Sequence, residues 1–546
     1  MTLIIIILRN VATKNRRGSE MGIYLNPGNE NFKGTLKADI YVDKTMMIDV
    51  INRFIDKENK YICISRPRRF GKTIAGNMLA AYYSGGCDSK ELFSGLKISE
   101  TKDFEKHLNR YNVIQIDMNS EYQNADNKKT VIRDLKKEIK SEIISAYPNV
   151  SFARNDTLAK CILKVYRDTG DTFVIIMDEY DVLVREQADP ELFDEYLAFL
   201  NGLFKSNVLK PAIALAYLTG ILPVVRDKIQ SKLNNFREYT ILNAGELAEY
   251  IGFTDDEVKA MCKEYELDYA GCRRWYDGYI QQGIELYNPE SVVRSIEEKE
   301  FGSYWGQTSS YEVIADRIRD NFAGMKDAVV RMLAGESVDI NVTQYLNTMN
   351  SFRTRDDAFT YLLHVGYLTY DRKEKTCRIP NGEVRQEWLN AIAVEQEYEK
   401  TDSIIRSSKE LLDETWKGNE KAVAKALDES HIHVSSNRSY NNEDALQSAI
   451  YLAYLYALNK YSVFREMTTG KGFADVVFVP FVPDIPAMII ELKRNKTAES
   501  AIDQIRKKEY FESLDHYSGN LIFVGINYDE KRKTHTCRID RFVKNR

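Results

Sequence analysis

Near the N-terminus, the sequence brings together residue types that bind phosphate groups. Gly71, Lys72 and Thr73 follow an apolar run, Tyr61–Ser65, and precede a helical pattern over residues 74–83. Backbone N–H groups of such a turn, and the positive end of the helix, point toward a bound phosphate. Lys72 would then reach the β- and γ-phosphates of a nucleoside triphosphate, and the Thr73 hydroxyl would contact Mg²⁺. The pattern therefore predicts a P-loop.

An acidic pair about a hundred residues later supports the same interpretation. A buried strand is expected over residues 173–177, and Asp178 and Glu179 follow it directly. Asp178 would hold Mg²⁺ through water, and Glu179 would polarise the attacking water. Each motif alone has a plain alternative: a helix that begins at a glycine, and a solvated strand end. Arg66 also stands where the first glycine of the loop is usual, but the order of the two motifs favours nucleotide binding and hydrolysis.

The C-terminal part carries residues suited to phosphodiester hydrolysis, which needs divalent metal held by carboxylates and a cation near the attacking water. Asp475 lies in the expected strand 474–478, and Glu491 and Lys493 close the expected strand 488–493. A period of two places Glu491 and Lys493 on one face of their strand. If the strands are adjacent, Asp475 and Glu491 can share a metal, and Lys493 can orient the nucleophilic water. The alternative is a cross-strand ion pair.

The elements that must position these residues fall into three ranges. Short apolar runs alternate with helical patterns over 21–245, which predicts a parallel sheet between helices. Residues 246–400 have mostly helical patterns and are expected to connect two domains. In 401–546, helices expected at 403–427 and 442–458 precede three strands, a helix over 498–511 and a strand over 521–526. Residues 1–20 are expected to be a loose tail or an overlong translation start, because their apolar run is too short for a membrane span.

The residues of the N-terminal half resemble the AAA-ATPase-like family of bacterial proteins. The resemblance rests on Tyr41-Val-Asp-Lys-Thr45, on Arg66-Pro-Arg-Arg-Phe-Gly-Lys-Thr73, on Asp178-Glu-Tyr-Asp181 and on Thr219-Gly220, and it continues to about residue 300. It implies a P-loop fold and a nucleotide site made of Arg66, Arg69, Gly71, Lys72, Thr73, Asp178 and Thr219. Thr219 would sense the γ-phosphate, with a plain strand cap as the alternative. No arginine finger is assigned, and Arg226 and Arg237 are only weak candidates.

The segment 466–510 resembles the PD-(D/E)XK nuclease superfamily, and the C-terminal domain is therefore expected to have a restriction-endonuclease-like α/β fold. The resemblance implies that Glu443, Asp475, Glu491, Lys493 and Gln504 form the site, with Glu443, Asp475 and Glu491 as metal ligands. Its metal would be Mg²⁺, with Mn²⁺ as an alternative. Basic clusters at 493–496, 506–508 and 531–533 could contact phosphates.

Composition limits the remaining choices. The chain has 546 residues, of which 44% are hydrophobic and 29% charged, so several folded domains are expected. Its formal net charge of −5 excludes a global basic field, and any nucleic-acid surface must be local. Seven scattered cysteines without a CxxC pair favour free thiols in a reducing compartment. The sequence thus predicts a cytoplasmic protein without a membrane partner.

Together these patterns predict an enzyme that binds and hydrolyses ATP and cleaves nucleic acid, with DNA favoured over RNA. The alternative is a nucleotide-switched signalling or scaffold protein whose C-terminal domain binds nucleic acid or a partner without cutting. Nothing in the sequence decides sequence preference, biological role or whether the chain forms a homo-oligomer.

Overall fold

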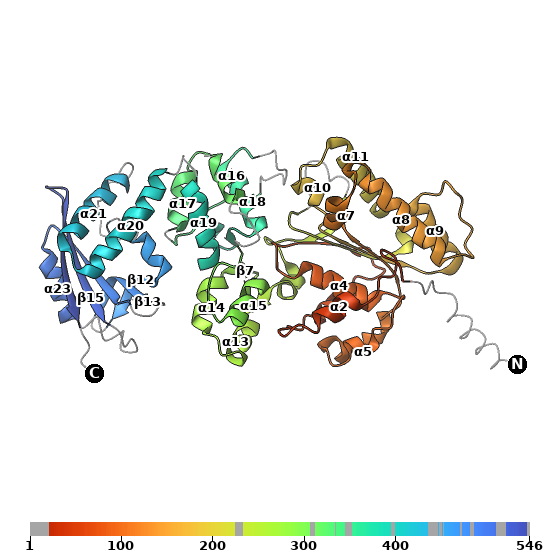
Figure 1. Cartoon of the computed structure of the whole chain (residues 1–546), viewed down its shortest axis with the longest axis horizontal. Coiled ribbons are helices and arrows are strands. Elements are labelled where there is room, and N and C mark those ends of the chain that lie inside the picture. The colour runs from red at the N-terminus through yellow and green to blue at the C-terminus, as the bar shows by residue number, and fades with distance from the viewer. Residues whose placement is uncertain are drawn as a thin grey trace. The chain divides into compact units, whose positions relative to one another are not determined.

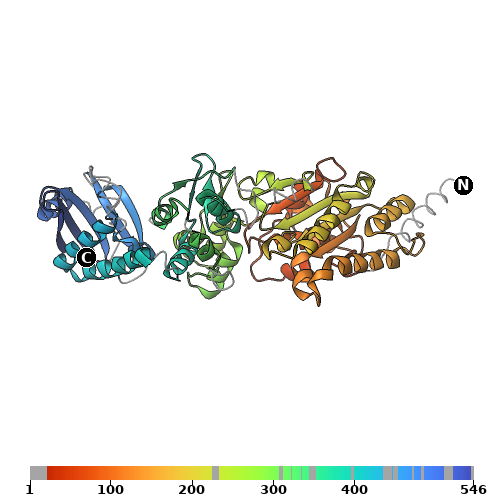
Figure 2. The same cartoon turned by 90° about the horizontal axis from the view of Figure 1, so that it is seen from above.

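A computed structural model gives the arrangement of the chain (Figures 1 and 2). It describes residues 21–223, 233–305, 312–320, 322–333, 335–343, 352–394, 399–434, 446, 450, 453–469, 472–480, 485–508 and 520–542. The chain forms two compact units: residues 1–308 with 338–384, and residues 309–337 with 385–546. These limits differ from the three ranges expected from the sequence, because residues 246–305 join the N-terminal sheet in one unit. Within the described ranges, no helix is long and apolar enough to cross a membrane.

The first unit is built on a five-stranded parallel sheet with the order β2-β3-β4-β1-β5. Its strands are β1 (Tyr61–Ser65), β2 (Asn112–Asp117), β3 (Phe173–Asp178), β4 (Ile213–Gly220) and β5 (Arg237–Tyr239). Strands β1, β3 and β4 are buried along their whole length, as continuous apolar runs predict for a sheet covered on both faces.

Helices cover both faces of this sheet, as the alternating pattern predicts (Figure 1). One face carries α7 (Met118–Asn124), α8 (Val131–Ala146), α9 (Leu158–Thr169) and α11 (Pro190–Phe204), whose apolar stripes share a core with the strands. In α8 the buried positions Ile132, Leu135, Ile139 and Ile143 recur every three or four residues, which is the spacing of one helix face. The other face carries α2 (Glu30–Thr35) and α4 (Lys72–Tyr83).

The remainder of the first unit is mostly helical, as expected, with two small sheets. Helices α13 (Asp255–Glu264), α14 (Tyr269–Tyr276) and α15 (Pro289–Glu298) share a core with a sheet of β6 (Phe253–Thr254), β8 (Ile284–Tyr287) and β7 (Tyr279–Gln281). A second sheet has the order β10-β11-β9, from Thr369–Asp371, Thr376–Arg378 and Val338–Asp339. Helix α18 (Arg355–Val365) lies between β9 and β10 in the chain.

The second unit contains the sheet β12-β13-β14-β15-β16. Its strands are Tyr461–Thr469, Gly472–Pro480, Ala487–Arg494, Leu521–Asp529 and Thr534–Phe542. All neighbours are antiparallel except β14 and β15, which are parallel and joined through α23 (Ala498–Lys507). Helices α20 (Glu399–Lys417) and α21 (Glu420–Val434) cover one face, and α23 packs on the other (Figures 1 and 2). The unit also includes α16 (Glu312–Arg319), α17 (Met325–Leu333) and most of α19 (Gly382–Val394).

Two expectations about this unit need correction. The single helix expected over 403–427 is two helices, because Gly418 adopts a φ of 79° and ends the first one. Strand β16 was not expected from the sequence, and the expected helix 442–458 lies largely outside the described residues. All seven cysteines are free thiols, as their spacing predicted.

Candidate active sites

The N-terminal site begins where β1 passes into α4. Gly71 lies between them with a φ of 90°, a conformation that a residue with a side chain rarely adopts, so the turn depends on glycine here. Lys72 and Thr73 then open the helix, with their side chains at its positive end. This is the strand–turn–helix order that the sequence predicted for a phosphate-binding loop.

The predicted Mg²⁺ residues meet at the edge of the sheet because of the strand order. Strand β4 lies between β1 and β3, so Thr219 at its end lies next to Asp178 at the end of β3. The Thr73 hydroxyl donates to Asp178 Oδ2 over 2.5 Å, and the Thr219 hydroxyl donates to Asp178 Oδ1. Two hydroxyl groups, one from the start of α4 and one from the end of β4, thus converge on the Asp178 carboxylate, which is the arrangement expected around a nucleotide-bound cation.

Glu179 lies between two cationic side chains. Its Oε1 is 3.7 Å from Lys72 Nζ, and its Oε2 accepts a hydrogen bond from Arg185 Nη2. Lys72 Nζ also donates to the carbonyl of Pro67 over 3.0 Å. Arg185 belongs to the short helix α10 (Val182–Arg185) and was not identified from the sequence. The charged groups that would handle the phosphates and the water are therefore paired with one another.

Burial sets the electrostatics of this cluster. It lowers the pKa of the Lys72 ammonium, although the Glu179 and Asp178 carboxylates oppose that shift. Burial also raises the pKa of the Glu179 carboxyl, and the positive charge of Lys72 works against the rise. Bound phosphates would place further negative charge beside the Lys72 ammonium. They would therefore offset the free-energy cost of burying this cation.

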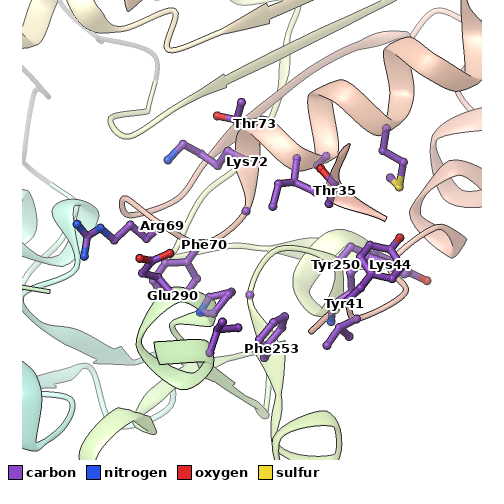
Figure 3. A pocket seen from close by; sticks show the side chains of 18 of the residues that line it. Thr35, Tyr41, Lys44, Arg69, Phe70, Lys72, Thr73, Tyr250, Phe253 and Glu290 are labelled. Atoms are coloured by element: carbon purple, nitrogen blue, oxygen red, sulfur yellow. The ribbon is translucent and has the colours of Figure 1, made fainter. Parts of the chain in front are cut away.

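A cavity of about 500 Å³ lies beside the loop (Figure 3). Figure 3 shows Lys72 and Thr73 on one side of it and Tyr41, Tyr250 and Phe253 on the other. The wall away from the phosphate loop is mainly apolar and aromatic, a surface that suits a planar base. It is formed by Phe32, Ile40, Tyr41, Val42, Tyr250, Phe253, Pro289 and Val293.

The two loop arginines have different surroundings. Arg66 is completely buried, and its guanidinium donates to the carbonyls of Ser65 and Tyr239, at 2.9 and 3.1 Å. It does not line the cavity, and burial lowers its pKa to about 10. Arg69 does line the cavity and donates to the carbonyl of Tyr304 over 2.8 Å. The geometry therefore gives Arg66 a role in joining β1 to β5 and leaves Arg69 within reach of a ligand.

Neither weak candidate for an arginine finger gains support from its position. Arg237 is half exposed on β5, pairs with Glu246 at 3.8 Å, and does not line the cavity. Arg226 lies outside the described residues.

In the second unit, Asp475 and Glu491 lie on adjacent antiparallel strands, β13 and β14. The register pairs Val476 with Ile490, and its continuation would place Asp475 opposite Glu491. The backbone pairing does not continue to these two residues, and Asp475 Oδ2 accepts a hydrogen bond from the backbone N–H of Leu492 over 2.7 Å. Both carboxyl groups thus reach the same end of the sheet, as a shared metal would require.

Lys493 forms an ion pair with Glu491 along one strand, β14, and not across two strands. Lys493 Nζ donates to Glu491 Oε1 over 2.8 Å, two residues away on β14. The side chains of Lys493 and Glu491 are only 10% and 2% exposed, so the pair is buried and not a surface ion pair. Burial and the neighbouring Asp475 charge raise the pKa of Glu491 to about 7, while Lys493 opposes the rise.

The chemistry of these donors fits a divalent cation. Glu491 Oε2 is buried and has no hydrogen-bond partner among the residues that the structure describes, which leaves one carboxylate oxygen for a ligand. Asp475 and Glu491 supply hard oxygen donors of the kind that Mg²⁺ and Mn²⁺ prefer. In the part of the chain that the structure describes, no group of three or more His, Cys, Asp or Glu side chains is gathered for a metal. Glu443, the third predicted ligand, lies outside that part.

Gln504 lies on α23, the helix that packs on the face of the sheet carrying Ile489 of β14, and the period of two along the strand gives Glu491 and Lys493 the same face. Residues Ala501, Ile502 and Ile505 of this helix are buried against β13, β14 and β15, and Gln504 is half-buried beside them. The structure therefore brings Asp475, Glu491 and Lys493 together and places Gln504 on the adjoining helix.

Comparison with known families matches both halves of the chain. Residues 28–230 match the family described as "Predicted AAA-ATPase", and residues 441–537 match the PD-(D/E)XK nuclease superfamily. The chain thus contains one segment that is similar to AAA-ATPase-like proteins and a later one that is similar to the PD-(D/E)XK nuclease superfamily. Both resemblances expected from the sequence are confirmed.

Three similar proteins are all distant from this chain in sequence. The "Uncharacterized protein in vnfD 5'region" of Azotobacter chroococcum mcd 1 is 22% identical over 522 residues, or 90% of this chain and 94% of that protein. The Aeropyrum pernix ORC2 protein in ADPNP–ADP complexes has 10% identity, a TM-score of 0.24 and coverage of 64% and 93% of the two chains. The Aeropyrum pernix ORC1 protein in complex with DNA has 9% identity, a TM-score of 0.22 and coverage of 91% and 100%. TM-scores of this size support no conclusion about the present chain.

Two features of the AAA-ATPase-like domain were missed from the sequence. The first is Arg185 with its partner Asp181, since only the turn after β3 brings them to Glu179. The second is the part of the apolar wall that comes from residues 250–253 and 289–293, beyond the end of the matched segment. The motif Tyr41-Val-Asp-Lys-Thr45 was recognised in the sequence, but the sequence alone did not show that residues 250–253 and 289–293 line the same cavity.

Proposed function

We propose that the N-terminal domain binds and hydrolyses ATP and that the C-terminal domain cleaves nucleic acid, with DNA favoured. The observation that carries the first part is the convergence of Thr73, Asp178 and Thr219 beside a cavity that Lys72 and Thr73 line. A bare phosphate site would not need the adjoining apolar wall, which is suited to a base. The match to the AAA-ATPase family supports the same function.

Each residue has a separate task in this proposal. The N–H groups at the start of α4 and the Lys72 ammonium would bind the phosphates, and Thr73 and Asp178 would hold Mg²⁺. Thr219 positions Asp178 through its hydroxyl, and Glu179 polarises the attacking water. Mg²⁺ supplies charge neutralisation on the phosphate oxygens when it is bound with the nucleotide.

Lys72→Ala should abolish ATP binding and leave the domain folded. The lysine supplies the phosphate contact, and its buried ammonium contributes little to stability because burial opposes its charge. Isothermal titration with a non-hydrolysable analogue measures the effect, and circular dichroism checks the fold. Lys90→Ala is the matched control, since Lys90 is a surface lysine outside the cavity. Wild-type affinity in Lys72→Ala would rule out the P-loop assignment.

In the C-terminal domain, Asp475, Glu491 and Glu443 would hold a divalent metal, and Lys493 would hold the attacking water. The metal supplies an activated water and stabilises charge on the phosphate. The unpartnered oxygen of Glu491, next to the Asp475 carboxylate and the Lys493 ammonium, is the observation that supports this part. The match to the PD-(D/E)XK nuclease superfamily supports it as well.

A cleavage assay separates the nuclease from a scaffold that only binds. Plasmid DNA, single-stranded DNA and RNA are incubated with the full chain and Mg²⁺ or Mn²⁺, with and without ATP. We expect metal-dependent cleavage of DNA by the wild type and none by Asp475→Ala. Binding of DNA without cleavage under every condition would favour the signalling or scaffold alternative.

A further inference from the structure

Arg185 is held at the nucleotide site by more than its contact with Glu179. Its Nε is 3.2 Å from Asp181 Oδ2, and its side chain is only 11% exposed. Asp181 Oδ2 in turn accepts the N–H groups of Ile221 and Leu222, at 3.1 and 2.8 Å, directly after β4 ends. Arg185 is therefore anchored to the end of the sheet through a buried carboxylate, and the position of its guanidinium is set by the fold.

The backbone of Glu179 is also fixed. Its φ of 50° is uncommon for a residue with a side chain, and its N–H donates to Asp178 Oδ1 over 2.9 Å. The carboxylate then has two neighbours: Arg185 at Oε2 and Lys72 near Oε1. The contact with Lys72 spans 3.7 Å, which is too long for a hydrogen bond.

We infer that Arg185 is a positioning residue for ATP hydrolysis, which holds one oxygen of Glu179 and leaves the other to accept a hydrogen bond from the attacking water. This inference rests on the proposed ATPase function. When Lys72 turns to the phosphates, Glu179 loses its second neighbour, and Arg185 alone fixes the carboxylate. A planar guanidinium that also forms an ion pair with Asp181 can hold a carboxylate in one orientation, whereas a flexible ammonium holds it less well.

The test compares Arg185→Ala, Arg185→Lys and Glu179→Gln with the double variant Arg185→Ala/Glu179→Gln in the full chain. Single-turnover hydrolysis gives the rate of the chemical step, and titration of a non-hydrolysable analogue gives the affinity. Arg185→Ala should slow hydrolysis by about 100-fold, the scale of a misplaced catalytic group, and change nucleotide affinity by less than about threefold. Arg185→Lys, which keeps the charge, should recover part of the rate and serves if the alanine variant fails to fold.

The double variant distinguishes positioning from a direct or structural role. Because Arg185 acts through Glu179, its removal should have almost no further effect when Glu179 is already Gln. An equal loss of rate in both backgrounds, or an unchanged rate in Arg185→Ala, would overturn the inference. Arg133→Ala on the exposed surface of α8 is the control and should match the wild type. A wild type without hydrolysis, or wild-type hydrolysis by Glu179→Gln, would instead refute the proposed function or the role of Glu179.

Discussion

Glu179→Gln should bind ATP as the wild type does and hydrolyse it about 100- to 10,000-fold more slowly, the range for loss of one general base. The substitution keeps the shape of the side chain and removes only its charge and its ability to polarise water strongly. Lys72, Thr73 and the apolar wall, which bind the nucleotide, remain. The measurement is phosphate release under saturating ATP, with affinity determined in parallel by titration.

Glu191→Gln provides the matched control for that variant, because Glu191 is an exposed carboxylate on α11. It should hydrolyse ATP at the wild-type rate. If Glu179→Gln also did so, the water-polarising role would belong to another group at the site. A parallel loss of affinity would show that Glu179 acts in binding, which its distance of 3.7 Å from Lys72 does not predict.

Lys493→Met should leave metal and DNA binding nearly intact and reduce cleavage by at least ~100-fold, the scale for one preorganised electrostatic group. The lysine lies beside Glu491 and carries no metal-binding atom. Its burial adds a second effect: removing one partner of a buried pair destabilises by about 3–5 kcal/mol when the other stays charged. Glu491 can reduce that cost by binding a proton, since its pKa is about 7. Thermal denaturation therefore accompanies the cleavage assay.

Two further variants help to interpret the result for Lys493→Met. Asp475→Asn should weaken metal binding itself, so it is expected to differ from Lys493→Met in a metal titration. Lys421→Met, on the exposed surface of α21, should match the wild type in every assay. Wild-type cleavage by Lys493→Met, where Asp475→Asn is inactive, would contradict the role of the lysine. If the wild type itself never cuts, the nuclease proposal fails.

Sequence patterns predicted the parts of the fold that depend on local burial. Continuous apolar runs located β1, β3 and β4, and with them the P-loop and the acidic pair, because strands buried on both faces have little freedom in composition. The spacing of Glu491 and Lys493 likewise predicted a shared face, and the two residues do contact each other.

Features that depend on tertiary packing were not predictable in this way. Arg185 follows Glu179 by six residues, a separation at which contact depends on the turn between them. The loop motif led to the expectation that Arg66 contacts phosphates. Its guanidinium instead donates to the carbonyl of Tyr239 on β5. That strand has three residues and no clear sequence pattern, so this contact could not be predicted. The end of α20 at Gly418 was missed because one glycine within a helical pattern is often tolerated.

The apolar wall of the nucleotide cavity limits how this protein can be recombined with its relatives. Residues 28–230 contain the phosphate loop, but Tyr250, Phe253 and Val293 complete the cavity from outside that segment. Gly366 adds a constraint, since a Cβ there would lie 2.7 Å from the side chain of the loop residue Pro67. A chimera joined at residue 230 would keep the phosphate loop and the part of the apolar wall around Tyr41, but the rest of that wall would come from the other parent. The segment that can be exchanged between relatives therefore extends beyond residue 230 into the middle of the chain. A chimera that keeps its nucleotide specificity must take the phosphate loop and the whole apolar wall from one parent.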